Sequence, residues 1–295
     1  MVLGSGARGV GRTRGEPRSR GPQMRTIQRR AGASLRVQLL GRIEVATQDG
    51  CTIRLGGRHS QALFALLALA RRPRSRDALA ADLWPDADGA SSAALRQALW
   101  LVRHGLADAG VRADSILEVE TDTVGLRPDV QLLLDTDRFE RCARSAGCST
   151  EAAVELYRGD LVEGLGHECF AAERERLSDL YEDALREVGE QRLQRGDLAG
   201  ARAAAEQLLA RDPLREEAHA LIIAIHGRAG SRSQVVRQYR RLRSVLVREL
   251  DVEPLPETDA IYREALARTL ERSHARAAAM HPAADQLSAL VAVTA

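Results

Sequence analysis

Dense apolar stretches alternate with short polar breaks between residues 56 and 106, and this pattern predicts three short helices. The first covers residues 60–70 and carries leucines at enough positions to be almost fully buried. Pro73 ends it because proline cannot continue a helix. Ser75 is the predicted N-cap of the second helix, residues 77–84, which carries leucines four residues apart.

Ser91 and Ser92 are predicted to cap the third helix. Its apolar stripe has spacings of four, three and four residues and consists of Leu95, Leu99, Val102 and Leu106. Burial of this stripe leaves polar and aromatic side chains on the opposite face, namely Arg96, Gln97, Trp100, Arg103 and His104. Such side chains reach phosphates and base edges, so we interpret the third helix as one that enters the DNA major groove.

Residues 116–120 and 123–127 alternate apolar and polar positions around Thr121 and Asp122, as the two strands of a hairpin do. Three helices followed by a hairpin form a winged helix-turn-helix, in which the wing lies beside the DNA backbone. We therefore add Thr121, Asp122 and Thr123, at the wing tip, to the candidate DNA-binding residues. The competing interpretation is a small helical domain whose arginines are merely solvated.

A small antiparallel sheet is predicted before the three helices, where it would support the first of them. Residues 35–46 alternate in two short runs, and Asp49-Gly50 is a strong hairpin signal. Cys51, Ile53 and Leu55 continue the alternation on the far side, which places Cys51 among core positions.

The second half of the chain is predicted to be helical after a linker from Pro128 to Asp135. Three-to-four spacing of apolar residues recurs in six segments, at residues 136–146, 150–158, 168–195, 197–211, 214–229 and 232–250. Gly196 and Gly230 lie 34 residues apart, the period of the tetratricopeptide repeat. Stacked helical pairs of this kind form a concave interaction surface.

The predicted fold is thus mostly α, with an N-terminal winged helix-turn-helix that includes a small β-sheet, followed by an all-α tetratricopeptide-like domain. We divide the chain into a disordered arginine-rich tail (1–34), the DNA-binding domain (35–128), the helical domain (129–272) and a second tail (273–295).

Composition excludes several chemistries and predicts no enzyme. All 43 basic residues are arginine, which removes the phosphate-binding lysine of nucleotide-binding loops and any lysine nucleophile. No hydrolase or metalloprotease motif is present, the seven histidines lack metal spacing, and we expect no cofactor. The four cysteines contain no CxxC pair and suggest no disulfide framework, so a cytoplasmic protein without a signal peptide fits best.

Charge is distributed unevenly and weighs against a simple DNA-binding interpretation. Residues 1–34 hold eight arginines and one acid (+7), residues 35–128 hold twelve and eleven (+1), and the remainder holds 23 and 29 (−6). A nearly neutral DNA-binding domain is unusual, because phosphate contacts ordinarily leave a positive surface. A cluster of arginines in residues 232–250 could be a second nucleic-acid patch, but ion pairs with neighbouring acids are favoured.

Several runs, in order, resemble the SARP (antibiotic regulatory protein) family of transcriptional activators. The N-terminal runs are LRVQLLGRIEV, SRDALAADLWPD and LVRHGL. The runs DTDRFERCARSAG, ELYRGDLVEGL, FAAERERL, DPLREEAH and QYRRLRSVLVRELDVEPLPET are similar to the bacterial transcriptional activator domain that accompanies this family. This chain departs from the family at Gln61, Leu101 and His104, where basic residues are common, and at the bulky Trp100.

The resemblance implies a protein that binds direct repeats in the −35 region of promoter DNA, self-associates through residues 129–270 and recruits RNA polymerase holoenzyme through its sigma factor. The regulated genes would be a secondary-metabolite cluster, and no membrane partner is implied. A second hypothesis is a helical-repeat scaffold that binds a protein or ligand and carries a degenerate DNA-binding domain. The near-neutral charge of residues 35–128 favours this alternative.

Overall fold

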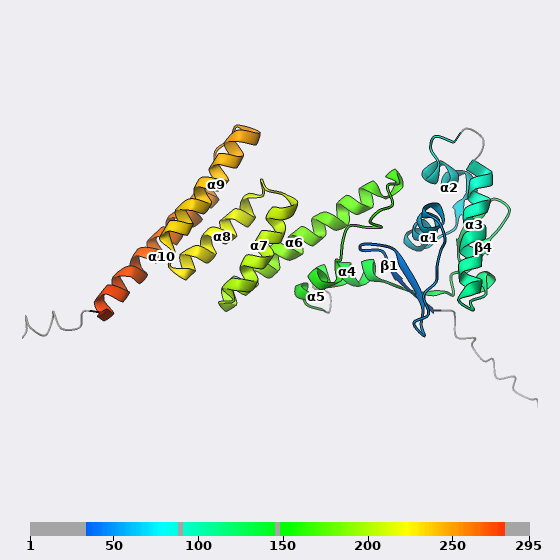
Figure 1. The fold of residues 1–295 in the computed structure, drawn as a ribbon, viewed down its shortest axis with the longest axis horizontal. Coiled ribbons are helices and arrows are strands. Elements are labelled where there is room, and N and C mark those ends of the chain that lie inside the picture. The colour runs from blue at the N-terminus through cyan, green and yellow to red at the C-terminus, as the bar shows by residue number, and fades with distance from the viewer. Residues whose placement is uncertain (1–33, 88–90, 145–147, 281–295) are drawn as a thin grey trace, which may run out of the picture. The chain divides into compact units, whose positions relative to one another are not determined.

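The computed structural model describes residues 34–87, 91–144 and 148–280 (Figure 1). These residues form ten α-helices, two 3₁₀ turns and six short strands, so the predicted mostly α fold is confirmed. The predicted N-terminal tail lies outside the described residues except for Ser34, and so do positions 281–295 of the C-terminal tail.

The first sheet contains β1 (Ser34–Gln38), β2 (Glu44–Thr47) and β6 (Gln131–Leu134), in the order β2-β1-β6. β1 and β2 are antiparallel, as predicted, whereas β6 runs parallel to β1. The linker expected at this point is therefore wrong, because residues 131–134 complete the sheet. A parallel pair needs a long crossover, and the three helices and the wing supply it.

The predicted third strand at Cys51 is also wrong, because that side of the hairpin contributes only an isolated bridge between Ala46 and Thr52. Cys51 itself is exposed, whereas Ile53 and Leu55 are buried. Cys51 is exposed because it lies at the hairpin turn, where its backbone carbonyl accepts from the backbone N–H of Thr47. On this side of the hairpin, the buried positions begin only after this turn.

The three N-terminal helices occur where the apolar spacing predicts them. They are α1 (Arg58–Ala70), α2 (Arg76–Leu83) and α3 (Ser91–Asp108). The Ser75 side chain accepts from the backbone N–H of Ala78 at 3.2 Å, which confirms it as the N-cap of α2. α3 begins at Ser91, so Ser91 and Ser92 lie within its first turn rather than before it.

The predicted wing is present and contains one strand more than expected. A 3₁₀ turn, η1 (Ala113–Ser115), leads into β4 (Leu117–Val119) and the antiparallel β5 (Thr123–Leu126). β3 (Arg74–Ser75), between α1 and α2, pairs with the other edge of β5. Its two residues are too few to show an alternating pattern in the sequence.

The second half of the chain contains the six predicted helical segments and one further helix. These elements are α4 (Asp135–Ala143), α5 (Thr150–Leu156), η2 (Glu168–Phe170), α6 (Ala171–Arg195), α7 (Leu198–Arg211), α8 (Glu216–Ala229), α9 (Arg232–Leu250) and α10 (Pro256–Met280). Gly196 and Gly230 end α6 and α8 in the left-handed conformation, with φ of 83° and 76°. Their 34-residue spacing therefore marks two equivalent helix ends.

α10 was not predicted as a helix, and it packs against α8 at a close approach. A Cβ on Gly227 of α8 would lie 2.7 Å from the Cβ of Ala265, so only two small residues allow this contact. Within the described residues, each helix from α6 to α9 packs on the next one along the chain.

One hydrophobic cluster extends from Leu35 in β1 through Phe139 in α4 and Leu177 in α6 to Ala218 in α8. The described residues of both halves therefore share one continuous hydrophobic core. The junction is also tied by Asp135, whose carboxylate accepts from the backbone N–H groups of Leu39 and Leu40 at 2.8 and 2.9 Å.

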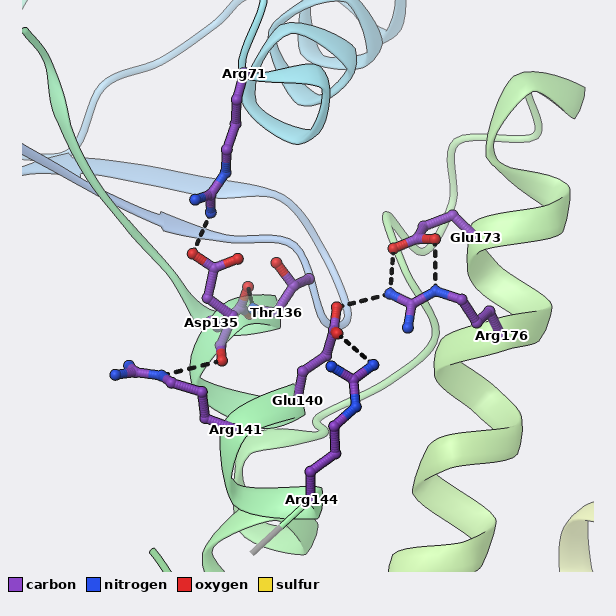
Figure 2. A network of polar contacts seen from close by, with 9 residues as sticks. Arg71, Asp135, Thr136, Glu140, Arg141, Arg144, Glu173 and Arg176 are labelled. Atoms are coloured by element: carbon purple, nitrogen blue, oxygen red, sulfur yellow. Dashed lines mark hydrogen bonds and ion pairs between the residues drawn. The ribbon is translucent and has the colours of Figure 1, made fainter. Parts of the chain in front are cut away.

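Polar contacts bridge α1, α4 and α6 at the same junction (Figure 2). Glu140 of α4 accepts from Arg144 at 2.9 Å and from Arg176 of α6 at 2.7 Å. Arg71, which ends α1, pairs with Asp137. Partly exposed pairs of this kind contribute about 0–1 kcal/mol each, so they orient the elements more than they stabilise them.

A disulfide joins Cys142 of α4 to Cys148, which contradicts the expectation of a framework without disulfides. Their Cα atoms lie 4.9 Å apart. A separation of six residues along the chain does not by itself indicate this pairing, because a disulfide also requires the two Cα atoms to lie within about 7 Å of each other.

Candidate nucleic-acid interface

The third helix is seated on the winged-helix core by the predicted apolar stripe. Leu95, Leu99, Val102 and Leu106 are all buried, and α3 packs on α1, α2 and η1. Gly105 makes the closest approach, because a Cβ at this position would lie 2.0 Å from the backbone carbonyl oxygen of Arg54. The position of α3 is thus fixed by both side-chain packing and direct backbone contact.

The opposite face of α3 is open to solvent. Five candidates on this helix are exposed together with Ser92, namely Arg96, Gln97, Trp100, Arg103 and His104, while Ser91 is half-buried. No helix from α4 to α10 covers these residues in the described part of the chain. The candidate residues therefore share one accessible surface.

Trp100 is 58% exposed, so packing of this side chain in the core against the wing is excluded. Its ring stacks on that of His104, with centroids 5.1 Å apart and planes 8° from parallel. The pair presents a flat aromatic surface on α3 of a kind that packs against sugars and base edges.

The wing tip is tied to the start of α2. Thr121 and Asp122 are exposed and Thr123 is half-buried, with its hydroxyl donating to the Glu120 carboxylate at 3.2 Å. The guanidinium of Arg76 donates to the Glu120 carbonyl at 3.1 Å, and its backbone N–H donates to the Asp122 carbonyl at 2.9 Å. Sequence reasoning missed Arg76 because only the tertiary fold brings β3 beside the wing.

Two of the basic side chains on this face of α3 form only long, exposed pairs with carboxylates. Arg103 lies 3.7 Å from Asp114 and His104 lies 3.7 Å from Asp108, with every partner well exposed. Exposed pairs at this distance contribute less than about 1 kcal/mol, so a phosphate can replace the carboxylate at small cost. Arg96 makes no ion pair with any described acid.

His219 and Cys169 are of residue types that can bind metals, but both have packing roles. His219 is buried, with Nε2 3.1 Å from the Pro213 carbonyl and Nδ1 2.8 Å from the side-chain nitrogen of Gln238. Burial raises the pKa of the Cys169 thiol to about 11, which makes it a poor ligand and nucleophile. Within the described ranges, no three His, Cys, Asp or Glu residues are grouped as a metal site would require.

A family model described as "Bacterial transcriptional activator domain" matches residues 131–266, slightly less than half of the chain. This match covers the part of the sequence in which the second set of runs resembles the domain that accompanies the SARP family. Residues 131–266 are therefore similar to the bacterial transcriptional activator domain. The resemblance stated from the sequence is thereby confirmed.

The fold of the chain is similar to that of a solved structure described as "Mycobacterium tuberculosis EmbR in complex with low affinity phosphopeptide". The two share 22% sequence identity with a TM-score of 0.66, over 85% of this chain and 71% of that one. At this identity the likeness shows the fold alone. No curated protein matches the chain significantly, and no described helix is both long and apolar enough to cross a bilayer.

Proposed function

We propose that the chain is a SARP-type regulator, a sequence-specific DNA-binding activator that binds direct repeats in a promoter and recruits RNA polymerase holoenzyme. The observation that carries the proposal is the exposed face of α3 beside the wing tip. A helix held rigidly by its apolar stripe, with arginine, glutamine and aromatic side chains on its outer face, is what major-groove recognition requires.

Each candidate residue has a distinct role in the proposed complex. Arg96 and Gln97, in the first half of α3, are suited to hydrogen bonds with base edges. Ser91 and Ser92 offer hydroxyl and backbone N–H groups to a phosphate at the start of the helix. Arg103 and His104 contact phosphates further along the groove, and Trp100 packs against sugar or a thymine methyl group. Residues 121–123 of the wing lie along the backbone of the adjacent strand.

The nearly neutral charge of residues 35–128 affects the proposed binding energetics. A site with few phosphate contacts gives a shallow dependence of affinity on salt and weak non-specific binding. Self-association on direct repeats compensates for the small number of phosphate contacts, because each bound copy raises the effective concentration of the other at the neighbouring repeat. The proposed targets are the promoters of a secondary-metabolite cluster near the gene.

A gel-shift titration with DNA from promoters adjacent to the gene tests the proposal. Arg103→Ala is expected to abolish specific retardation, whereas Arg42→Ala, an exposed arginine in the turn between β1 and β2, keeps it. Absence of retardation even at low salt, where phosphate attraction is greatest, refutes the proposal and favours the scaffold hypothesis. Run-off transcription from the same DNA then tests polymerase recruitment.

A further inference from the structure

A groove of about 440 Å³ lies between α7, α8 and α9, and no residue of the winged helix lines it. Its apolar part is formed by Leu209, Ala210 and Ile222, and Arg202, Arg237 and Arg241 bring three guanidinium groups to it. Glu206, which pairs with Arg202 at 2.7 Å, is the only acidic residue of its lining within the part of the chain that the structure describes.

Only some of the α9 arginines form the ion pairs with neighbouring acids that the sequence predicts. Arg243 and Arg248 pair with Glu253 and Glu249, as expected for a solvated face. Arg237 and Arg241 make no ion pair with any acid in the described part of the chain, and both are exposed. With three arginines and one glutamate in its lining, the groove is basic within an otherwise acidic half of the protein.

Two glutamines of α9, Gln234 and Gln238, supply neutral hydrogen-bonding groups to the groove. Gln238 is held in place because its amide nitrogen lies 2.8 Å from Nδ1 of the buried His219. Burial lowers the pKa of His219, so the ring is neutral and Nδ1 accepts while Nε2–H donates to Pro213. The amide carbonyl of Gln238 keeps no protein donor among the described residues and is available to a ligand.

We propose that this groove binds an extended acidic peptide segment of a partner protein. Arg237 and Arg241 pair with carboxylates of the peptide, the amide of Gln238 accepts from its backbone, and apolar side chains rest on Ile222 and Leu209. All three interactions are arranged in one concave strip between helices, as helical-repeat proteins use to bind peptides.

The lining favours a peptide over nucleic acid. A single strand of nucleic acid binds by stacking its bases on aromatic side chains, and no Phe, Tyr or Trp lines the groove among the residues that the structure describes. A duplex is contacted by elements that protrude into its grooves, whereas these arginines surround a depression. The proposed peptide site is separate from α3, so it does not depend on DNA binding.

Fluorescence anisotropy with the full chain tests the inference. The probes are a fluorescein-labelled peptide of about twelve residues built from Asp, Glu, Ser and Leu, its Asn/Gln analogue, and an oligothymidylate of similar length. We expect saturable binding of the acidic peptide alone. The double variant Arg237→Gln/Arg241→Gln is expected to weaken this binding about tenfold through the loss of two partly exposed ion pairs.

Two single variants sharpen the test. Glu206→Gln removes the carboxylate of the groove and releases Arg202, so it is expected to tighten peptide binding about twofold or more. Arg248→Gln, on the same helix but outside the groove, is expected to leave the affinity unchanged. Equal binding of the Asn/Gln peptide, tighter binding of the oligothymidylate, or an equal loss in Arg248→Gln each overturns the proposal. The double variant Arg237→Gln/Arg241→Gln is expected to leave the DNA gel shift unchanged, so a loss of peptide binding can be told apart from a failure of the DNA-binding proposal.

Discussion

Gly105→Ala is expected to displace α3 from its seat, although it adds only one methyl group. The added Cβ would lie 2.0 Å from the carbonyl oxygen and 2.9 Å from the carbonyl carbon of Arg54, both backbone atoms that cannot rotate away. Restoring an ordinary contact of about 3.4 Å requires a shift of more than about 1 Å between α3 and residues 54–55. Such a shift disrupts the packing of Val102 and Leu106, which are fully buried.

The expected change in the free energy of unfolding of Gly105→Ala is the sum of two opposing contributions. Alanine is intrinsically better than glycine inside a helix by about 1 kcal/mol. Forcing backbone elements apart in a packed core costs about 3 kcal/mol, at the upper end of the range for overpacking. We therefore expect a net loss of about 2 kcal/mol in the free energy of unfolding, which corresponds to a fall of about 4–8 °C in Tm for a protein of this size.

Urea unfolding followed by circular dichroism measures this loss, and a gel shift of the same variant measures its effect on DNA binding. Gly166→Ala is the matched control, because Gly166 is exposed outside any helix or strand and a Cβ at this position meets no atom within 4 Å. The control is expected to stay within about 0.5 kcal/mol of the parent. A Gly105→Ala protein as stable as the parent or more so would show that the contact with Arg54 does not fix α3.

Three further predictions concern other parts of the molecule. Trp100→Ala is expected to leave Tm within about 2 °C because its side chain is largely exposed, while gel shifts show weaker DNA binding. Burial raises the pKa of the Asp160 carboxyl, but the hydrogen bond and charge of Arg211 lower it further, so that the pKa lies below its ordinary 3.8. Asp160→Asn should therefore reduce the free energy of unfolding by up to about 1 kcal/mol at pH 7. In urea titrations this difference should vanish as the pH falls below 3.8. Cys148→Ser opens the disulfide with Cys142 and is expected to lower stability by about 2 kcal/mol, the entropy of closing so short a loop, and a reductant should then no longer change the melting curve.

Sequence by itself determined the elements whose signals are local. The apolar spacing of α3, the N-cap at Ser75 and the alternation that forms the wing all depend on residues within a few positions of one another. The 34-residue spacing of Gly196 and Gly230 likewise reflects two helix ends, each set by its own left-handed residue. The sequence also determined which α3 side chains are exposed, because residues spaced three and four apart share one face of a helix and the remaining positions lie on the opposite face.

Only the tertiary structure decided what depends on the path of the chain. The pairing of β6 with β1 joins residues about a hundred positions apart, and no local pattern encodes that partner. The disulfide at Cys142 and the lack of an ion partner for Arg237 among the described residues have the same origin, because a thiol or a charge meets whatever the fold brings near it. Periodicity specifies which way a side chain faces, whereas the long-range packing of whole elements specifies what it faces.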